Sequence, residues 1–512
     1  MLLLVTGATG YIGGRLVPEL LDAGHRVRVL ARHPERLVDR AWAGRVEIAT
    51  GDATDAAALH AAMVGVDVGY YLMHSMLSGD DFEREERRVA RLFGQAARDC
   101  ELSRIVYLGA LAHEGRGRTL SHHIRSRQEV GETLRASGVP TIELRAAMII
   151  GSGSASFEMV RHLTERLPVM ITPRWVRTRT QPIAIRDVLR YLVAVASLPD
   201  QINRAFEVGG PEILTYRGMI EGYARVAGLR DRRIVPVPVL TPSLSSHWVG
   251  AVTPVPRAIA RPLVDSLSTE TVCREHDIAE LVPDPPEGLV PYERAVELAL
   301  RRVEMVDVAT TWSDSSVPGV SSDPLPSDPD WAGGTIYIDE RRTTVAASAA
   351  SLWQVIDGVG GGRGYYSFPL AWEVRGWLDR LGGGVGLARG RRDPDRLRVG
   401  DPLDFWRVEA RVPMELLRLR AEMRLPGLAW LELSIERQPD PDGHESVVYH
   451  QRALFHPRGL WGHVYWRAVA PFHGRIFGPM LTNIRAAAEE LERSVGAGPG
   501  AGPSDATRTM AG

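Results

Sequence analysis

The sequence contains no lysine, so its 61 basic residues are all arginines. A drift from lysine to arginine codons in a GC-rich genome is the simplest cause. Whatever the cause, the absence excludes Schiff-base chemistry and any mechanism that needs a lysine ammonium group.

Cysteine is also scarce, because only Cys100 and Cys273 occur. Two cysteines exclude a disulfide framework and a zinc site of the cysteine-cluster type. The histidines at 450, 456, 463 and 473 are irregularly spaced, with no cysteine or close carboxylate pair near them. We therefore expect no metal site.

Neither sign of charge is in excess. The chain has 63 acidic residues against 61 basic ones, a formal net charge of -2 at pH 7, which gives no overall attraction to nucleic acid or to an acidic membrane. The N-terminus lacks the basic region and cleavage site of a signal peptide. No apolar run approaches the roughly 20 residues that span a bilayer. These absences predict a cytoplasmic protein without a nucleic-acid partner or a transmembrane segment.

What the sequence does contain is a glycine-rich turn between a strand and a helix. An apolar run at residues 1–5 leads into Thr-Gly-Ala-Thr-Gly-Tyr-Ile-Gly-Gly, and leucines at helical spacing follow. Such a turn brings backbone amides at a helix N-terminus close to a pyrophosphate. The preceding strand, the following helix and a second strand at residues 25–31 are the context that dinucleotide binding requires. The candidate cofactor contacts in this turn are Thr6, Gly7, Thr9, Gly10, Tyr11, Ile12 and Gly13.

Arg32 follows the second strand. An acidic residue there would bind the ribose of NAD, whereas an arginine suits the 2′-phosphate of NADP. Arg32 therefore favours NADP over NAD, although a solvated arginine that opens the next loop is the alternative.

Further candidates lie at the ends of the next two strands. Asp52 and Ala53 follow the strand at residues 46–49 and could receive the adenine, while an acid in this stretch could also cap the helix at 56–64. Met73 and His74 end the strand at 66–75, where they would lie near the pyrophosphate and the ribose.

The stretches 6–13, 51–55, 181–188 and 206–216 resemble an extended, atypical short-chain dehydrogenase/reductase of the NmrA-like type. The resemblance covers about residues 1–305. It implies an α/β domain with a doubly wound parallel Rossmann sheet and a bound NAD(P).

The chain departs from this family at the catalytic motif. Active members use Tyr-x-x-x-Lys on a helix and a serine at the end of the preceding strand. Here His123 stands in the place of the tyrosine, Arg127 in that of the lysine, and Gly109 near that of the serine. Arginine could hold the ribose, and an imidazole can exchange a proton near neutral pH. His123 is therefore either a replacement acid/base or a sign that the chemistry has been lost.

Composition predicts the domain boundaries. At 512 residues the chain should hold more than one domain. Residues 311–332 are rich in Ser, Pro and Asp, so they read as a linker between a nucleotide domain at 1–310 and a second domain at 333–494. Residues 495–512 are of low complexity and are expected to form a disordered tail.

The second domain begins with a strand and a short helix, and several strands and a long C-terminal helix follow. The strands are expected at 335–345, 371–377, 405–413, 416–425, 429–438 and 445–456, and the last two should form a hairpin. The prolines at 471 and 479 should kink or divide the helix at 460–493.

This order resembles the START-like, helix-grip fold, an α+β architecture whose antiparallel sheet usually encloses an apolar ligand against the helix. Aromatic residues are frequent between residues 353 and 466. They form either an ordinary core or the lining of a pocket.

These patterns lead to one principal hypothesis and one rival. The first is an NADP(H)-dependent oxidoreductase for a hydrophobic carbonyl or alkene compound, with His123 as proton donor and Arg127 on the ribose. The second domain would bind or shield that substrate. The rival is a protein that binds NADP without turnover, as a redox sensor or an assembly factor. Isomerase or lyase chemistry is a third option, and the protein could form a homodimer.

Overall fold

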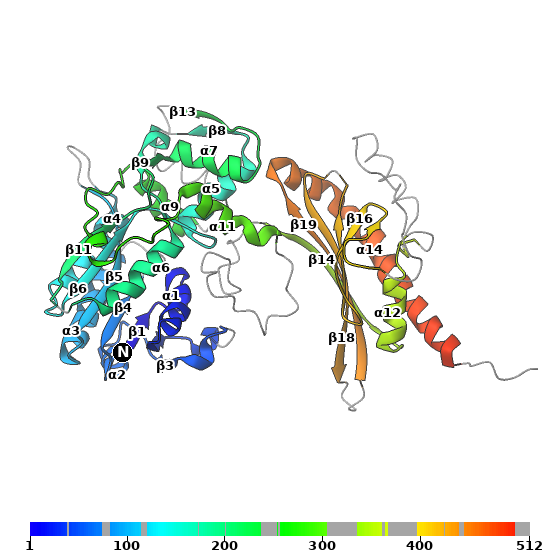
Figure 1. Cartoon of the computed structure of the whole chain (residues 1–512), viewed down its shortest axis with the longest axis horizontal. Coiled ribbons are helices and arrows are strands. Elements are labelled where there is room, and N and C mark those ends of the chain that lie inside the picture. The colour runs from blue at the N-terminus through cyan, green and yellow to red at the C-terminus, as the bar shows by residue number, and fades with distance from the viewer. Residues whose placement is uncertain are drawn as a thin grey trace, which may run out of the picture. The chain divides into compact units, whose positions relative to one another are not determined.

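The fold was analysed in a computed structural model of the whole chain. It divides into two compact units, residues 1–334 and 335–512, which are described separately below (Figure 1). The structure describes residues 1–37, 40–73, 82–113, 120–172, 174–199, 201–236, 253, 257–304, 335–360, 364–366, 397–423, 425–439 and 445–496. His74, the predicted linker, the predicted strand at 371–377 and residues 497–512 of the predicted tail lie outside these residues, whereas residues 495 and 496 belong to the last helix.

The first unit is built on a parallel sheet of seven strands in the order β11-β6-β5-β4-β1-β2-β3. Every neighbouring pair in this sheet is parallel. The strand order reverses between β1 and β4, and ligands of doubly wound sheets bind at such a point. The strands are β1 (Leu2–Thr6), β2 (Arg26–Ala31), β3 (Glu47–Thr50), β4 (Val68–Tyr71), β5 (Arg104–Ala110), β6 (Thr141–Ala146) and β11 (Arg204–Val208).

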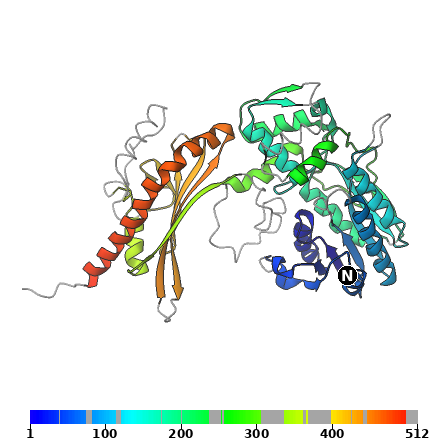
Figure 2. The same cartoon turned by 180° about the vertical axis from the view of Figure 1, so that it is seen from behind.

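Helices cover both faces of this sheet (Figures 1 and 2). On one face, α1 (Tyr11–Asp22) and α6 (Ile185–Ala194) bury their apolar stripes against the strands. On the other face, α2 (Ala56–Met63), α3 (Phe82–Asp99) and α4 (His122–Arg135) do the same. The Rossmann architecture that the resemblance implied is therefore confirmed.

A smaller layer of helices and short strand pairs is formed by segments that come after β6, before and after β11. Phe157, Met219, Tyr223 and Val296 belong to the apolar cluster that joins α5, α7 and α11. The elements of this layer are α5 (Ala155–Arg166), α7 (Tyr216–Val226), α9 (Arg257–Ser266), α10 (Ile278–Leu281), α11 (Tyr292–Glu304), β7 (Ile149–Ile150), β8 (Val169–Thr172), β9 (Arg179–Thr180), β10 (Ile183–Ala184), β12 (Leu214–Thr215) and β13 (Arg233–Pro236).

The second unit is a six-stranded antiparallel sheet in the order β14-β19-β18-β17-β16-β15, with a long helix beside it. The predicted hairpin is present, because β18 and β19 pair antiparallel from Gly427–Pro457 to Pro439–Glu445. The elements are β14 (Tyr337–Val345), α12 (Ala349–Asp357), β15 (Pro402–Leu403), β16 (Trp406–Val412), β17 (Leu416–Ala421), β18 (Gly427–Pro439), β19 (Glu445–Pro457) and α14 (Gly459–Gly496).

We expected Pro471 and Pro479 to kink or divide the C-terminal helix, and α14 is not divided at either residue. Both prolines lie on exposed positions of the helix. Phe477, Met480 and Ile484 are buried in the core against the sheet. This packing holds the helix together despite the backbone hydrogen bonds that the prolines remove.

Aromatic side chains fill much of the interior of the second unit. Trp353, Tyr365, Phe405, Trp406 and Tyr449 are all buried in its core. Where α14 meets the sheet edge, Trp466 stacks between Tyr337 and Phe455, with ring centroids 5.1 and 5.7 Å away. These aromatics act as packing residues.

Candidate functional site

The glycine-rich turn brings the backbone at Gly7 into close contact with the backbones at Gly13 and Leu72. Gly7 has φ +76°, and a Cβ there would lie 2.6 Å from the carbonyl oxygen of Leu72 beyond β4. A Cβ on Gly13 would lie 2.4 Å from the carbonyl oxygen of Gly7. Only glycine fits either position without a backbone shift.

The N-terminus of α1 is open to an anion. Its N-cap is Gly10, no side chain caps it, and its first turn carries no acidic residue. The amides of the first turn therefore keep hydrogen-bonding capacity, and the helix dipole favours negative charge there. This is the geometry that holds a pyrophosphate.

The side chains of the turn play different parts. Thr9 and Gly10 are exposed at its mouth. The Thr6 hydroxyl instead donates to the carbonyl oxygen of Tyr70 (2.8 Å), and Ile12 packs against the core. The half-buried Tyr11 ring lies under the Arg15 guanidinium at 4.3 Å. The side chains of Thr6 and Ile12 therefore make contacts within the protein, a hydrogen bond for Thr6 and apolar packing for Ile12.

Arg32 and Asp52 lie together beyond β2 and β3. An Arg32 Nη1 is 3.8 Å from an Asp52 carboxylate oxygen, and the Arg32 side chain is 70% exposed. The Thr54 amide donates to the Asp52 carboxylate (2.9 Å), and this hydrogen bond lowers the pKa of Asp52. The helix cap is the neighbouring Asp55, whose carboxylate accepts from the Ala57 amide. Asp52 thus stays ionised and does not cap α2, while Ala53 is buried.

Arg40 also lies beside the glycine-rich turn, and the sequence patterns did not indicate it. An Arg40 Nη2 donates to the carbonyl oxygen of Thr9 at 3.4 Å, and a Cβ on Gly14 would lie 2.9 Å from its Nη1. Arg40 adds positive charge beside the open N-terminus of α1. No local signal marks it, because the contact spans 31 residues.

The first turns of α4 carry both predicted catalytic residues, and Arg127 contacts the same sheet edge. Ser121 caps the helix, and His123 is half-buried one turn before Arg127. Arg127 donates to the Met73 carbonyl oxygen (3.2 Å) and to that of Leu108, and it lies 4.8 Å from the Tyr107 ring centre. Arg127 therefore ties together the carboxyl ends of β4 and β5.

Gly109 stands near the position that a serine occupies in active members of the family. A Cβ at this position would lie 2.7 Å from a carboxylate oxygen of Glu143, whose side chain is fully buried on β6. Glu143 pairs with Arg135 and, at 2.9 Å, with Arg145. A buried ion cluster thus occupies the space that a serine would need.

This cluster carries a stability prediction. Replacing Glu143 with alanine leaves two partly buried guanidinium groups without their shared carboxylate, which should cost about 3–5 kcal/mol in the free energy of unfolding. Replacing Glu47, which pairs with Arg26 and Arg28 but is 41% exposed, should cost less than about 1 kcal/mol. Urea unfolding of both variants would test this, and equal losses would contradict it.

A second group lies at the ends of β5 and β11. His113 Nε2 is 3.2 Å from both a Glu207 carboxylate oxygen and the Val272 carbonyl oxygen. Burial and the nearby Glu207 raise the pKa of the Cys273 thiol to about 12, so the thiol stays protonated near neutral pH. Sequence analysis missed this group because its members lie far apart along the chain.

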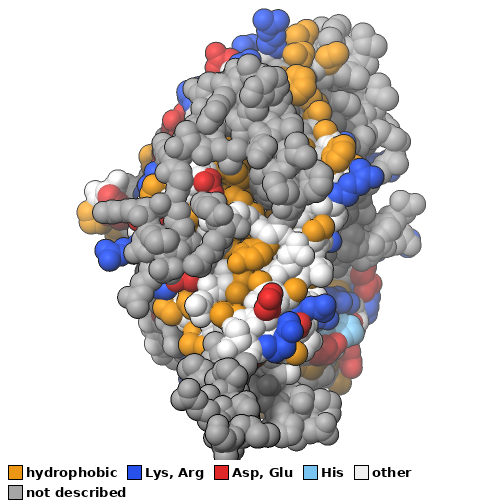
Figure 3. All heavy atoms as spheres, turned by 90° about the vertical axis from the view of Figure 1, so that its right-hand side faces the viewer, with side chains coloured by type: hydrophobic (Ala, Val, Ile, Leu, Met, Phe, Trp, Pro, Cys, Tyr) orange, Lys and Arg blue, Asp and Glu red, His pale blue; other side chains and the backbone are white. Residues whose placement is uncertain are grey.

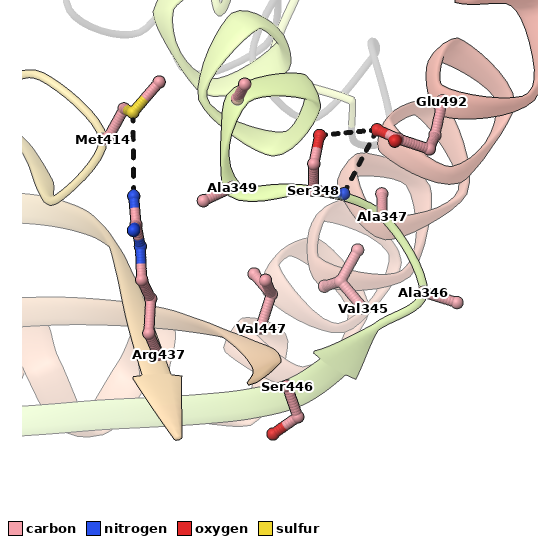
Figure 4. Close-up of a pocket in the computed structure, with 11 residues that line it drawn as sticks. Val345, Ala346, Ala347, Ser348, Ala349, Met414, Arg437, Ser446, Val447 and Glu492 are labelled. Atoms are coloured by element: carbon pink, nitrogen blue, oxygen red, sulfur yellow. Dashed lines mark hydrogen bonds between the residues drawn. The ribbon is translucent and has the colours of Figure 1, made fainter. Parts of the chain in front are cut away.

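The second unit has a pocket of about 640 Å³ where β14 runs into α12 (Figure 4). Ser348 caps α12, and its hydroxyl and amide both bond to Glu492 of α14 (2.6 and 3.1 Å). Across the pocket, Arg437 contacts the Met414 sulfur at 3.7 Å. The lining is mostly small side chains, and its polar side chains already have partners within the protein.

Metal sites and membrane-spanning helices are two further features that a protein of this size could contain. Among the described residues, no group of three or more His, Cys, Asp or Glu side chains could hold a metal ion. In the parts of the chain with described coordinates, no helix combines the length and the apolarity needed to cross a bilayer.

Comparison with known families supports the two-unit division of the chain. Residues 7–165 match the family described as NAD(P)H-binding. Residues 331–480 match a family described as a protein of unknown function (DUF2867).

Individual relatives align with the first unit. A (4-alkanoyl-5-oxo-2,5-dihydrofuran-3-yl)methyl phosphate reductase from Streptomyces griseus is 32% identical over 233 residues, which are 44% of this chain and 74% of the relative. A ceramide reductase from Caulobacter vibrioides is 28% identical over 234 residues, 45% of this chain and 72% of the relative.

Among solved structures, the triphenylmethane reductase of Citrobacter sp. complexed with NADP(H) is 20% identical. That match covers 58% of this chain and 100% of the reductase, with a TM-score of 0.47. By its sequence matches, the chain therefore belongs to the NAD(P)H-binding, NmrA-like group of atypical short-chain dehydrogenases/reductases, with a C-terminal DUF2867 domain.

Proposed function

We propose that this protein is an NADP(H)-dependent reductase of a hydrophobic small molecule with a carbonyl or alkene group. The observation that carries the proposal is the arrangement at one sheet edge. The open N-terminus of α1 lies after β1, Arg127 lies beside the ends of the neighbouring β4 and β5, and His123 stands one helical turn before Arg127 on α4. A dinucleotide bound across this edge would have its phosphates at the N-terminus of α1 and its nicotinamide near His123 and Arg127.

The residues present fit such a cofactor. The amides in the first turn of α1 would hold the pyrophosphate, with Arg40 nearby. Asp52 and Ala53 would border the adenine, and Arg127 would lie against the nicotinamide ribose beside Met73. The bound cofactor supplies a hydride.

His123 would supply the proton that completes the reduction. When hydride adds to a carbonyl carbon, the oxygen takes up one proton, and the product is an alcohol. An alkene would take its proton on carbon. An imidazole is able to donate a proton near neutral pH. Arg127, fixed by the Met73 and Leu108 carbonyls, would keep its position through this step.

Arg32 supports NADP rather than NAD as the cofactor. Its exposed guanidinium at the end of β2 is free to turn from Asp52 to a 2′-phosphate, because their 3.8 Å pairing lies at the surface. The Arg32→Ala variant should bind NADPH about 10- to 100-fold more weakly, since a charged hydrogen bond contributes about 1.5–3 kcal/mol. Its NADH affinity should stay the same.

Calorimetric titration of both nucleotides checks this preference. Arg36→Ala is the matched control, because Arg36 lies in the same loop four residues further on. An equal loss of NADPH and NADH affinity in the Arg32 variant would contradict a contact with the 2′-phosphate.

The relatives support the substrate class. By their names, the two reductases act on an alkanoyl-substituted dihydrofuranyl phosphate and on ceramide. We infer a substrate with an alkyl chain, which the second unit would bind or shield. We also infer a cytoplasmic location and a homodimer, as for many enzymes of this fold.

The rival function is nucleotide binding without turnover. It is favoured by the loss of the family's tyrosine and lysine and by the filled space beside Gly109. Assays of NADPH oxidation with a panel of apolar ketones, aldehydes and enones distinguish the two functions. Turnover supports the reductase, whereas tightly held nucleotide without any turnover supports the sensor.

A further inference from the structure

The long helix α14 carries large apolar side chains on its solvent face. Leu460, Val464 and Phe472 are spaced in multiples of four residues, so they lie along one side of the helix. Their exposed fractions are 42%, 45% and 54%, and that of the neighbouring Trp461 is 75%. Scattered exposed apolar residues are common, but four aligned on one helix form a patch, which we call the α14 outer face.

This outer face lies opposite the side that packs on the sheet. Trp466, Phe477, Met480 and Ile484 point to the core, where the last three are buried. At about 100° per residue, the exposed set is centred half a turn away from the buried set. The first half of α14 is therefore apolar on both sides, which is unusual for a helix with only one packed side.

The arginines and acidic residues of α14 are separated along the helix, because all those before Glu489 are arginines. Residues 459–488 contain no aspartate or glutamate, whereas Arg467, Arg475 and Arg485 occur within them. Arg467 and Arg475 are exposed, and by helical spacing both fall within or beside the apolar outer face. The acidic residues begin only at Glu489, near the other end of the helix. In the view of Figure 3, the described part of the surface carries hydrophobic side chains together with both basic and acidic ones.

We propose that the α14 outer face binds the surface of an anionic lipid bilayer. Tryptophan and phenylalanine suit the interface between headgroups and acyl chains, and arginines beside them suit anionic headgroups. The helix would lie on the surface, because it does not meet the requirements for crossing a membrane. The net charge of -2 does not oppose this, since a local cationic stripe acts within about one Debye length.

Vesicle flotation of the full-length protein tests the proposal. The probe is vesicles of phosphatidylcholine and phosphatidylglycerol in equal parts, compared with phosphatidylcholine alone. We expect the protein to float with the anionic vesicles and much less with the neutral ones. High salt should weaken the binding, because its electrostatic part is screened.

Variants separate the apolar and the charged contributions. Trp461→Ser with Phe472→Ser should reduce binding to anionic vesicles at least about tenfold. Arg467→Gln with Arg475→Gln should remove the preference for anionic over neutral vesicles. Val169→Ser with Ile171→Ser is the matched control, because these residues of β8 are 52% and 57% exposed in the other unit. This control should bind vesicles like the parent, and all variants should keep the parent's nucleotide affinity.

Two results would overturn the proposal. One is no flotation of the parent protein with anionic vesicles. The other is flotation that the Trp461 and Phe472 substitutions leave unchanged. If those substitutions instead convert a dimer to a monomer in analytical ultracentrifugation while vesicles do not bind, the outer face is a contact between two copies.

Discussion

Replacing Gly13 with alanine is expected to abolish measurable NADPH binding, with a loss of affinity of at least about a hundredfold. The added Cβ would lie 2.4 Å from the Gly7 carbonyl oxygen and 2.9 Å from Cα of Ala8. The turn must open to relieve both contacts, and the amides at the start of α1 then lose their alignment. Each charge-assisted hydrogen bond lost to the pyrophosphate removes about 1.5–3 kcal/mol. Isothermal titration calorimetry with NADPH measures the effect.

Gly44→Ala is the matched control for this substitution. A Cβ on Gly44 would meet no atom within 4 Å. This variant should therefore bind NADPH like the parent protein. If Gly13→Ala unfolds at the parent's temperature and also binds NADPH with the parent's affinity, the turn is not the pyrophosphate site.

Replacing His123 with alanine should lower turnover by about 10²- to 10⁴-fold, the usual contribution of a positioned general acid. NADPH affinity should change little, because on this proposal the phosphates and the adenine would be held at the ends of β1 to β3. The measurement is steady-state NADPH oxidation with a substrate from the ketone, aldehyde and enone panel, together with NADPH titration of the same preparation.

His122→Ala controls for the change of a histidine at the start of α4. The His122 side chain is 79% exposed and contacts Glu83 at 2.7 Å. Its loss should leave turnover near that of the parent. Full turnover in the His123 variant would contradict its role, and the pair of His113 and Glu207 would then be the next source of the proton to test.

Local patterns were enough to predict the strand, the turn and the helix of the candidate nucleotide site. The apolar run before Thr6, the glycines at 7, 10 and 13 and the helical spacing after them correspond to β1, the turn and α1. Each signal depends on neighbours within a few residues, so sequence alone reveals it. The position of Arg32 after β2 follows the same logic.

Contacts between distant segments could not be predicted in this way. Arg40 reaches Thr9 across 31 residues, and the carboxylate of Glu143 blocks a side chain at position 109 from a neighbouring strand. Neither arrangement has a local pattern. For a related reason, α14 is not divided at Pro471, because packing of α14 on the sheet outweighs a local helix-breaking preference.

The central claim is that the first unit binds NADP(H) at the turn formed by residues 6–13. Calorimetric titration of the purified protein with NADPH and with NADH tests it most directly. We expect one nucleotide per chain and clearly tighter binding of NADPH than of NADH. If the protein binds neither nucleotide, residues 6–13 are not a cofactor site, and any activity of the protein would then have to be sought in its second unit.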